Sequence, residues 1–360
     1  MTPLAELAGV LAGPDGAARL AELAPNRAAE VLALARAHGV EAWLAALAPA
    51  AWTETAIQRV RFAAAARRDR HALDEFGAVA EASGIRWLAV KGQATAESLY
   101  PHPSWRYAVD VDVLVPPARF EQLGAALTSA GWQLLDRNWP LLAATRPGEL
   151  RFRSPAGVLF DVHWHLMTTP ALRANFGFDT DWLLARGRAL DSGLPALSGP
   201  DQLVHLAVHA ALSGASRLSW LLDTGLAARA VTDWTGVAEA AAAQHAALPL
   251  ALVLRRAARW LGTPSGPGSS WGWLLAAVDR LSPVSAEPER PALARSFARS
   301  ARRSGPASLV EFSRHLSAFV RDGAPRTRRR SPLGDPADVR SPLHDVPDAA
   351  ARARYFASLT

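Results

Sequence analysis

The sequence predicts an α+β fold, in which a strand-rich middle region lies between two helical regions. Residues 1–80 and 201–320 place apolar residues at three-to-four spacing, which is the period of an amphipathic helix. Residues 81–200 instead contain short runs of Val, Leu, Trp and Phe separated by turn residues, a pattern typical of strands. Residues 321–360 are rich in Pro, Asp and Arg, which predicts a flexible tail.

The individual elements follow from the same patterns. In the N-terminal region, residues 28–49 and 52–84 are predicted to be helical, and Gly84 marks the end of the second stretch. The middle region is expected to contain one helix at 116–131 and strands at 85–90, 107–115, 131–135, 149–154 and 158–166.

The composition is that of an ordinary globular protein, with 50% hydrophobic and 20% charged residues among 360. The chain has no cysteine, which excludes disulfides and thiolate metal sites. The apolar runs are too short to span a bilayer, and the N-terminus lacks the features of a signal peptide. We therefore expect a cytoplasmic protein without membrane association.

Almost all of the positive charge comes from one residue type. The formal net charge is +6, and arginine supplies every basic residue except Lys91. This charge allows a phosphate-bearing partner without requiring one. The run RTRRR at 326–330 could contact nucleic acid, although a solvated tail is the favoured interpretation.

The first candidate for chemistry is the segment YAVDVDVLV at 107–115. Strand alternation puts Asp110 and Asp112 on one face, where two carboxylates repel each other unless a cation or water separates them. The pair therefore favours a divalent metal site, and all-oxygen ligation favours Mg²⁺, with Mn²⁺ as the alternative. The spacing alone is equally consistent with an edge strand that carries two solvent-facing aspartates.

A third carboxylate lies on a later predicted strand. The segment RFRSPAGVLFDVHWHL at 151–166 is expected to form a hairpin, whose second strand carries Asp161, His163 and His165 on one face. Two strands of one sheet could then present Asp110, Asp112 and Asp161 together. Three carboxylates could hold two metal ions in a phosphoryl-transfer site.

Lys91 fits such a site. It ends an apolar strand and precedes Gly92, which allows a sharp turn into a helix beginning near Gln93. The free N–H groups of that helix would point at an anion, and Lys91 would add a compact positive charge for a phosphate group.

Taken together, these segments resemble the nucleotidyltransferase superfamily that includes DNA polymerase β. The closer resemblance is to a bacterial branch of uncharacterised nucleotidyltransferases. Residues 90–92, 99–115 and 160–166 carry the resemblance, and residues 203–229 contribute a weaker match, so that it covers about 80–230.

The resemblance implies a mixed β-sheet flanked by helices, and a Mg²⁺-dependent transfer of a nucleotidyl group from a nucleoside triphosphate (NTP). By the same resemblance, Asp110 and Asp112 would bind both metal ions. Asp161 would bind the catalytic ion and could help to deprotonate the attacking hydroxyl.

The resemblance also implies residues that bind the nucleotide. Gly92 matches the phosphate-loop glycine, but Gln93 stands where many members have a serine, and Lys91 could compensate. Arg106 would contact phosphate or brace the aspartates; a salt bridge to one of them is an equally good interpretation. His163 could reach the substrate, or it could be a sheet histidine with its hydrogen bonds satisfied.

We therefore expect an enzyme that moves a nucleotidyl group from an NTP to a hydroxyl of a small molecule, peptide or protein. The group that is moved is expected to be AMP. The alternative is a non-catalytic nucleotide-binding or regulatory module that kept the fold. A second histidine pair, His205 and His209, could bind metal, but helix packing is favoured because no third ligand lies nearby in sequence.

Overall fold

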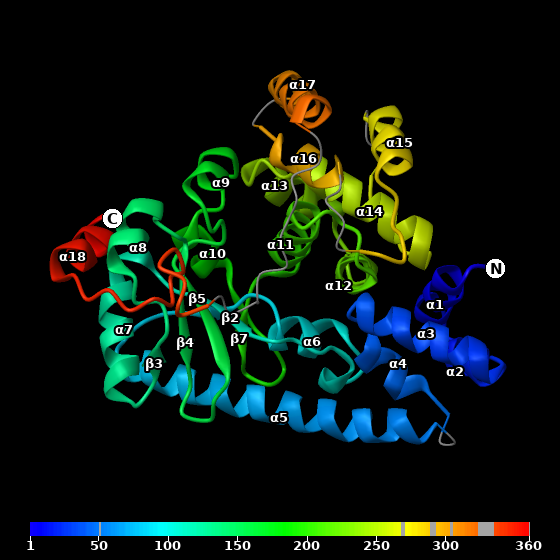
Figure 1. The fold of residues 1–360 in the computed structure, drawn as a ribbon, viewed down its shortest axis with the longest axis horizontal. Coiled ribbons are helices and arrows are strands. Elements are labelled where there is room, and N and C mark those ends of the chain that lie inside the picture. Colours follow the sequence, from blue (N-terminus) through cyan, green and yellow to red (C-terminus); the bar gives the residue numbers. More distant parts are fainter. Residues whose placement is uncertain (50–51, 268–270, 289–292, 303–304, 323–334, 360) are drawn as a thin grey trace. The chain divides into compact units, whose positions relative to one another are not determined.

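The computed structural model of the protein describes residues 1–49, 52–267, 271–288, 293–302, 305–322 and 335–359 (Figure 1). It confirms the α+β class: the described residues form many helices and a seven-stranded mixed sheet. None of the described helices combines the length and the apolarity that a membrane span requires.

The chain folds into two compact units, each assembled from separate stretches of sequence. The helical unit comprises residues 1–66, 95–107 and 199–326, and the sheet unit comprises residues 67–94, 108–198 and 327–360. This division differs from the four consecutive regions expected from the sequence. Two helices, α5 (Thr53–Ala82) and α6 (Gln93–Leu99), each contribute residues to both units.

The remaining elements of the helical unit are α1 (Pro3–Ala12), α2 (Gly16–Ala21), α3 (Pro25–Ala37), α4 (Glu41–Leu47), the 3₁₀ helix η1 (Pro103–Trp105), α11 (Gly199–Leu212), α12 (Leu218–Arg229), α13 (Trp234–Ala243), α14 (Ala247–Leu261), α15 (Gly272–Leu281), α16 (Leu293–Arg299) and α17 (Gly305–Asp322). Those of the sheet unit are β1 (Leu88–Ala89), β2 (Val111–Leu114), η2 (Pro117–Arg119), α7 (Phe120–Ser129), β3 (Gln133–Leu134), α8 (Trp139–Thr145), β4 (Glu149–Arg153), β5 (Leu159–His163), α9 (Pro170–Asn175), α10 (Thr180–Arg186), β6 (Arg188–Ala189), β7 (Pro195–Ala196) and α18 (Ala349–Ala357).

The strands of the sheet follow the order β3-β4-β5-β2-β1-β7-β6. Strands β2 and β5 are parallel, as are β1 and β7, and every other neighbouring pair is antiparallel. The predicted hairpin is confirmed as β4 and β5. Its turn is closed by a hydrogen bond from Ser154 N to the carbonyl oxygen of Val158 and by one from Val158 N to the Ser154 hydroxyl. The two strands that carry the aspartates, β2 and β5, are therefore neighbours.

The two faces of the sheet differ in chemistry. Val113 of β2 and Phe160 of β5 belong to a buried apolar core, in which Phe76 of α5 stacks on Phe160 at 5.6 Å. The helices α7, α8 and α18 contribute to the same core. Because successive side chains alternate along a strand, Asp112 and Asp161 lie on the opposite face of the sheet.

Strand alternation ends before His165. Strand β5 stops at His163, and the carbonyl oxygen of Gly148 accepts hydrogen bonds from both Trp164 N (2.8 Å) and His165 N (3.1 Å). His165 Nδ1 accepts a hydrogen bond from the backbone N–H of Met167 at 2.9 Å. His165 therefore belongs to the turn after β5, and the expectation that it continues the face of Asp161 is wrong.

The C-terminal segment corrects a second expectation. Residues 335–359 are not a flexible tail: α18 lies against α8 (Figure 1), and Tyr355 is fully buried in the core of the sheet unit. The Tyr355 hydroxyl accepts a hydrogen bond from Trp164 Nε1 and donates one to the carbonyl oxygen of Pro147, each at 3.1 Å. The basic run at 326–330 lies outside the described residues.

Tyr355→Phe tests whether this packing holds in solution. The substitution leaves Trp164 without one of its two acceptors and the carbonyl oxygen of Pro147 without one of its two donors, so we expect the free energy of unfolding to fall by about 1–2 kcal/mol. Urea denaturation followed by circular dichroism measures it. Tyr107→Phe is the matched control, because Tyr107 is half exposed and should lose less than about 0.5 kcal/mol. Equal stabilities of Tyr355→Phe and the wild type would contradict the packing.

A buried histidine gives the helical unit a pH dependence. His38 is fully buried, and its Nδ1 accepts a hydrogen bond from the backbone N–H of Leu218 at 3.2 Å. Burial, aided by the charge of Arg217, lowers the pKa of His38 to about 4. Between about pH 6.5 and 4 the unfolded chain therefore binds a proton that the folded chain does not, so stability is lost as the pH falls.

We expect the free energy of unfolding to decrease by about 2 kcal/mol between pH 7 and pH 5 because of His38. His38→Asn keeps an acceptor near Leu218 but cannot be protonated, so it should lose this part of the pH dependence. Urea denaturation at both pH values measures it, with the exposed His71→Asn as control. An unchanged pH profile in His38→Asn would contradict the assignment.

Candidate functional site

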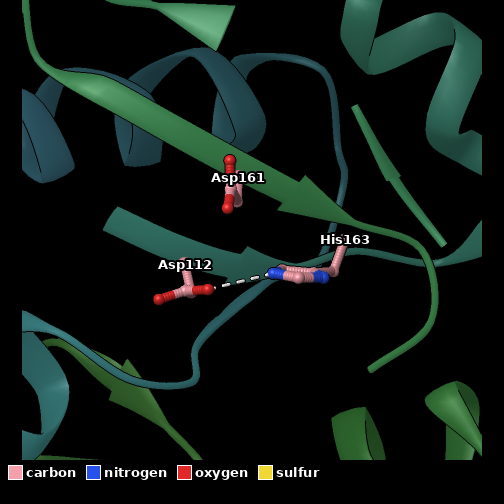
Figure 2. Close-up of side chains that lie close together, drawn as sticks. All are labelled: Asp112, Asp161 and His163. Carbon is pink, nitrogen blue, oxygen red and sulfur yellow. Dashed lines mark hydrogen bonds and ion pairs between the residues drawn. The ribbon is translucent and has the colours of Figure 1, made fainter. Parts of the chain in front are cut away.

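The register of two parallel strands brings two aspartates together. Strands β2 and β5 pair Asp112 with Asp161, and Leu114 with His163 (Figure 2). Ligand atoms of Asp112, Asp161 and His163 all lie within 4.8 Å of one another. Within the described part of the chain, no other cluster of three acidic, histidine or cysteine side chains has this geometry. We call these three residues the Asp-Asp-His cluster.

Asp112 is the most heavily paired member of this cluster. Its side chain is 4% exposed, and its Oδ1 atom lies 2.8 Å from Lys91 Nζ and 3.1 Å from His163 Nε2. Burial alone would raise the pKa of Asp112, but Lys91 and His163 outweigh it and hold that pKa far below its usual range. In return, Asp112 helps to keep the pKa of Lys91 raised against the effect of burial.

Asp161 is in the opposite electrostatic position. Burial, followed by the charges of Glu149 and Asp112, raises its pKa well above the ordinary value of a carboxyl group. A cation near Asp161 would offset this repulsion. A carboxylate with a raised pKa is also a stronger base, which is the property needed to accept a proton from a hydroxyl group.

Glu149 is a site residue that the sequence reasoning missed. It lies on β4 directly opposite His163, and its Oε2 atom is 3.1 Å from His163 Nδ1. The contact has the distance of an ion pair without the alignment of a hydrogen bond, so this buried Nδ1 has no aligned acceptor among the described residues. A signal was available: a hairpin that turns at 155–157 places residue 149 opposite residue 163.

The turn after β1 brings Lys91 to the cluster. Val90 N donates a hydrogen bond to the carbonyl oxygen of Asp112 at 3.1 Å, and Gly92 has a φ of 54°. A Cβ atom at Gly92 would lie 3.3 Å from the carbonyl oxygen of Asp110, so the glycine permits both the turn and the close approach. Gln93 is buried and begins α6. In this structure the ammonium of Lys91 contacts the carboxylate of Asp112.

A family model described as "Uncharacterised nucleotidyltransferase" matches residues 24–262, roughly two thirds of the chain. The chain belongs to this family. No curated protein and no solved structure gives a significant match. The match confirms the resemblance expected from the motifs between 80 and 230, and family membership supports a role in nucleotidyl transfer.

The other aspartate of the family's D-x-D segment stands beside the cluster. Asp110 is half-buried and directly precedes β2, so it is close to Asp112 without being one of the three mutually close ligands. Burial and the charge of Asp112 raise its pKa, and the charge of Asp110 in turn contributes to the raised pKa of Asp161. The structure therefore brings Asp112 and Asp161 together with His163, and places Asp110 at the edge of the group.

Arg106 forms a salt bridge within the helical unit. Its Nε and Nη2 atoms donate to the two carboxylate oxygens of Asp223, each at 2.9 Å, and the Tyr100 hydroxyl donates to Asp223 Oδ1 at 2.6 Å. Arg106 therefore forms a salt bridge with Asp223, whereas the interpretation from the sequence had named Asp110 or Asp112 as its partner. Two N–H donors in a fork that matches a carboxylate make this a strong pair.

The second histidine pair is a packing feature. His205 is 4% exposed, and the ring of His209 lies edge-on to that of Trp220 at 6.2 Å. Neither histidine belongs to a ligand cluster among the described residues. The packing interpretation of this pair is therefore favoured by the structure.

The Asp-Asp-His cluster fits a divalent cation. It offers two carboxylates and one imidazole from adjacent strands of one sheet, and the neighbouring Asp110 and Glu149 deepen the negative potential. Carboxylate oxygens suit Mg²⁺ and Mn²⁺, and imidazole nitrogen suits transition metals. The hydrogen-bonded strands of the sheet fix the positions of the three ligand side chains. A metal site needs ligands that are held rigidly in this way.

Proposed function

We propose that this protein transfers a nucleotidyl group, AMP, from an NTP to a hydroxyl group of a small molecule, a peptide or a protein. The observation that carries the proposal is the in-register pairing of Asp112 with Asp161 on β2 and β5. Membership of a nucleotidyltransferase family supports the reaction class. The choice of AMP is the expectation drawn from the sequence.

The acidic residues have separate roles in this proposal. Asp110, Asp112 and Asp161 would hold the metal, and a bound Mg²⁺ or Mn²⁺ ion supplies positive charge that stabilises the transferring phosphoryl group. The acceptor oxygen attacks the α-phosphorus, the bond from that phosphorus to the bridging oxygen breaks, and pyrophosphate leaves. Asp161 accepts the proton of the acceptor hydroxyl. The protein thus contributes mainly position and charge.

The turn after β1 is the proposed phosphate-binding part. Lys91 has a flexible stem and carries a compact charge, so its ammonium can bind the triphosphate from its present place beside Asp112. Gly92 allows the backbone to approach, and Gln93 takes the place of the family's serine. His163 would orient the substrate or the metal. Arg106 is proposed to have a structural role and not to bind phosphate, because its guanidinium already binds Asp223.

Labelled ATP tests the proposal directly. Purified protein is incubated with Mg²⁺ or Mn²⁺, a cell extract as the source of acceptors, and ATP labelled at either the α- or the γ-phosphate. We expect covalent transfer of the α-label alone, with a matching mass increase on the acceptor; the other NTPs are tested in parallel. Transfer of the γ-label would identify a kinase and would contradict the proposal. Omission of metal separates catalysis from a contaminant.

A non-catalytic nucleotide-binding module is the second candidate. The observation that favours it is the pairing of Asp112 with both Lys91 and His163, which already compensates the charge of this carboxylate. Such a module would bind NTP without transferring a label to any acceptor. Its nucleotide affinity would also be the same for the wild type and for Asp161→Asn.

A further inference from the structure

We propose that His163 is itself a metal ligand, that Glu149 is the residue that positions its ring, and that the site therefore prefers Mn²⁺ and similar transition ions to Mg²⁺. This inference rests on the proposed function in so far as it concerns the same metal site. It goes beyond that function because it gives the site a nitrogen ligand and names the class of ion.

The placement of the imidazole carries the first step. His163 is only 5% exposed, and its Nε2 atom points at Asp112, with the carboxylate of Asp161 beside them (Figure 2). Nε2 lies 3.1 Å from Asp112 Oδ1. Two adjacent ligands of an octahedral ion are about 3 Å apart when each bond is about 2.1 Å long. The imidazole therefore stands where a ligand of the same ion as Asp112 would stand.

Glu149 carries the second step. Metal-bound histidines almost always present their other ring nitrogen to a carboxylate or carbonyl group, which fixes the ring and the position of its proton. Glu149 Oε2 lies 3.1 Å from His163 Nδ1, on the side of the ring away from Asp112. With an ion bound, the proton of the imidazole would sit on Nδ1, facing the carboxylate of Glu149, which is within reach but not aligned in the present structure. The lone pair of Nε2 would then be free to bind the ion beside Asp112 and Asp161. In this role Glu149 acts only through His163 and binds neither the ion nor the substrate. Glu149 is therefore a positioning residue.

The choice of ion follows from the donor atoms. A site with two carboxylates and one imidazole suits Mn²⁺ and later first-row ions, whereas Mg²⁺ strongly prefers oxygen. Lys91 competes with a cation for Asp112 Oδ1, since its ammonium is 2.8 Å from that atom. Asp161 and His163 are then the ligands that decide which ion binds, and one of them is a nitrogen.

Pulsed electron paramagnetic resonance on protein loaded with Mn²⁺, without nucleotide, tests the inference. We expect modulation from a directly bound ¹⁴N nucleus, its replacement by a ¹⁵N signal in protein grown with ¹⁵N-histidine, and its loss in His163→Asn. The isotope experiment uses the wild-type chain, so it does not depend on the folding of a variant. Bound Mn²⁺ without nitrogen coupling, or no binding of Mn²⁺, would overturn the proposal.

Metal titrations test the preference and the role of Glu149. Mn²⁺ should bind at least tenfold more tightly than Mg²⁺ to the wild type, and this ratio should shrink in His163→Asn. Glu149→Gln should keep the nitrogen signal but bind Mn²⁺ about 10- to 100-fold more weakly. Glu121→Gln is the control, because Glu121 is exposed on α7 and should leave the affinity unchanged. Unchanged affinity in Glu149→Gln would remove the positioning role.

These readouts are independent of nucleotidyl transfer. A nitrogen-coupled Mn²⁺ site in a protein that transfers no label would uphold the metal inference and contradict the proposed function. Transfer of the α-label without nitrogen coupling would do the reverse.

Discussion

Asp161→Asn should abolish nucleotidyl transfer and leave the protein at least as stable as the wild type. Burial, together with the charges of Glu149 and Asp112, raises the pKa of Asp161 well above the ordinary value. A neutral amide of nearly the same shape removes the repulsion and keeps the packing. The same substitution removes a proposed metal ligand and the proposed base, for which we expect a loss of at least about 10³-fold in rate.

The combination of the two outcomes is what makes this test specific. A structural residue loses stability when it is changed, whereas a residue kept for catalysis often improves stability when it is neutralised. Transfer of α-labelled ATP measures activity, and thermal unfolding in the presence of chelator measures stability without any contribution from metal. Asp191→Asn, on an exposed turn, is the control. Activity like that of the wild type, or a fall in the unfolding temperature, would contradict the role given to Asp161.

The sequence predicts those parts of this site that depend on local pattern. Within β2 and β5, alternation separates the buried apolar residues from Asp112 and Asp161, because one face of the sheet must be buried. It fails outside them: Val109, expected on the apolar face, is exposed. Alternation cannot predict which strands are neighbours. The pairing of Asp112 with Asp161 depends on β2 and β5 lying side by side and parallel. The sequence predicted only that the two strands belong to one sheet.

Long-range partners are the part that pattern reasoning misses. The partner of Arg106 is Asp223, more than a hundred residues away, and nothing in either segment marks the pair. The helix α18 was missed for a related reason. It is short and follows a long polar segment, so its stability comes from packing of Tyr355 and its neighbours and not from its own sequence. Glu149, in contrast, could have been found by counting along the predicted hairpin.

The structure also changes what is expected of the chain's single lysine. Lys91→Met should destabilise the protein by about 3–5 kcal/mol, because it leaves the carboxylate of Asp112 buried with one of its two basic partners missing. From sequence alone, Lys91 was expected to matter for phosphate binding. The ion pair of 2.8 Å adds a structural role in the protein without nucleotide. Chemical denaturation of the variant measures the loss.

A double-mutant cycle isolates this ion pair. In an Asp112→Asn background the carboxylate paired with Lys91 is gone and only the weaker effects of Asp110 and Asp161 remain, so Lys91→Met should then cost less than about 1 kcal/mol. The difference between the two costs is the coupling energy of the pair. Equal costs in both backgrounds would show that Lys91 stabilises the protein through other contacts, such as those of its aliphatic stem.

Metal rescue joins the two roles of the lysine. Removal of the ammonium frees Asp112 Oδ1 for a cation, so Mn²⁺ should bind Lys91→Met more tightly than the wild type and should stabilise it more. In Lys91→Met/Asp112→Asn this additional stabilisation should disappear, because the carboxylate that the ion and the lysine share is gone. If Mn²⁺ stabilised Lys91→Met and the wild type equally, the lysine and the ion would not compete for Asp112. The ion would then have to bind through Asp161 and His163 without displacing the ammonium from Asp112.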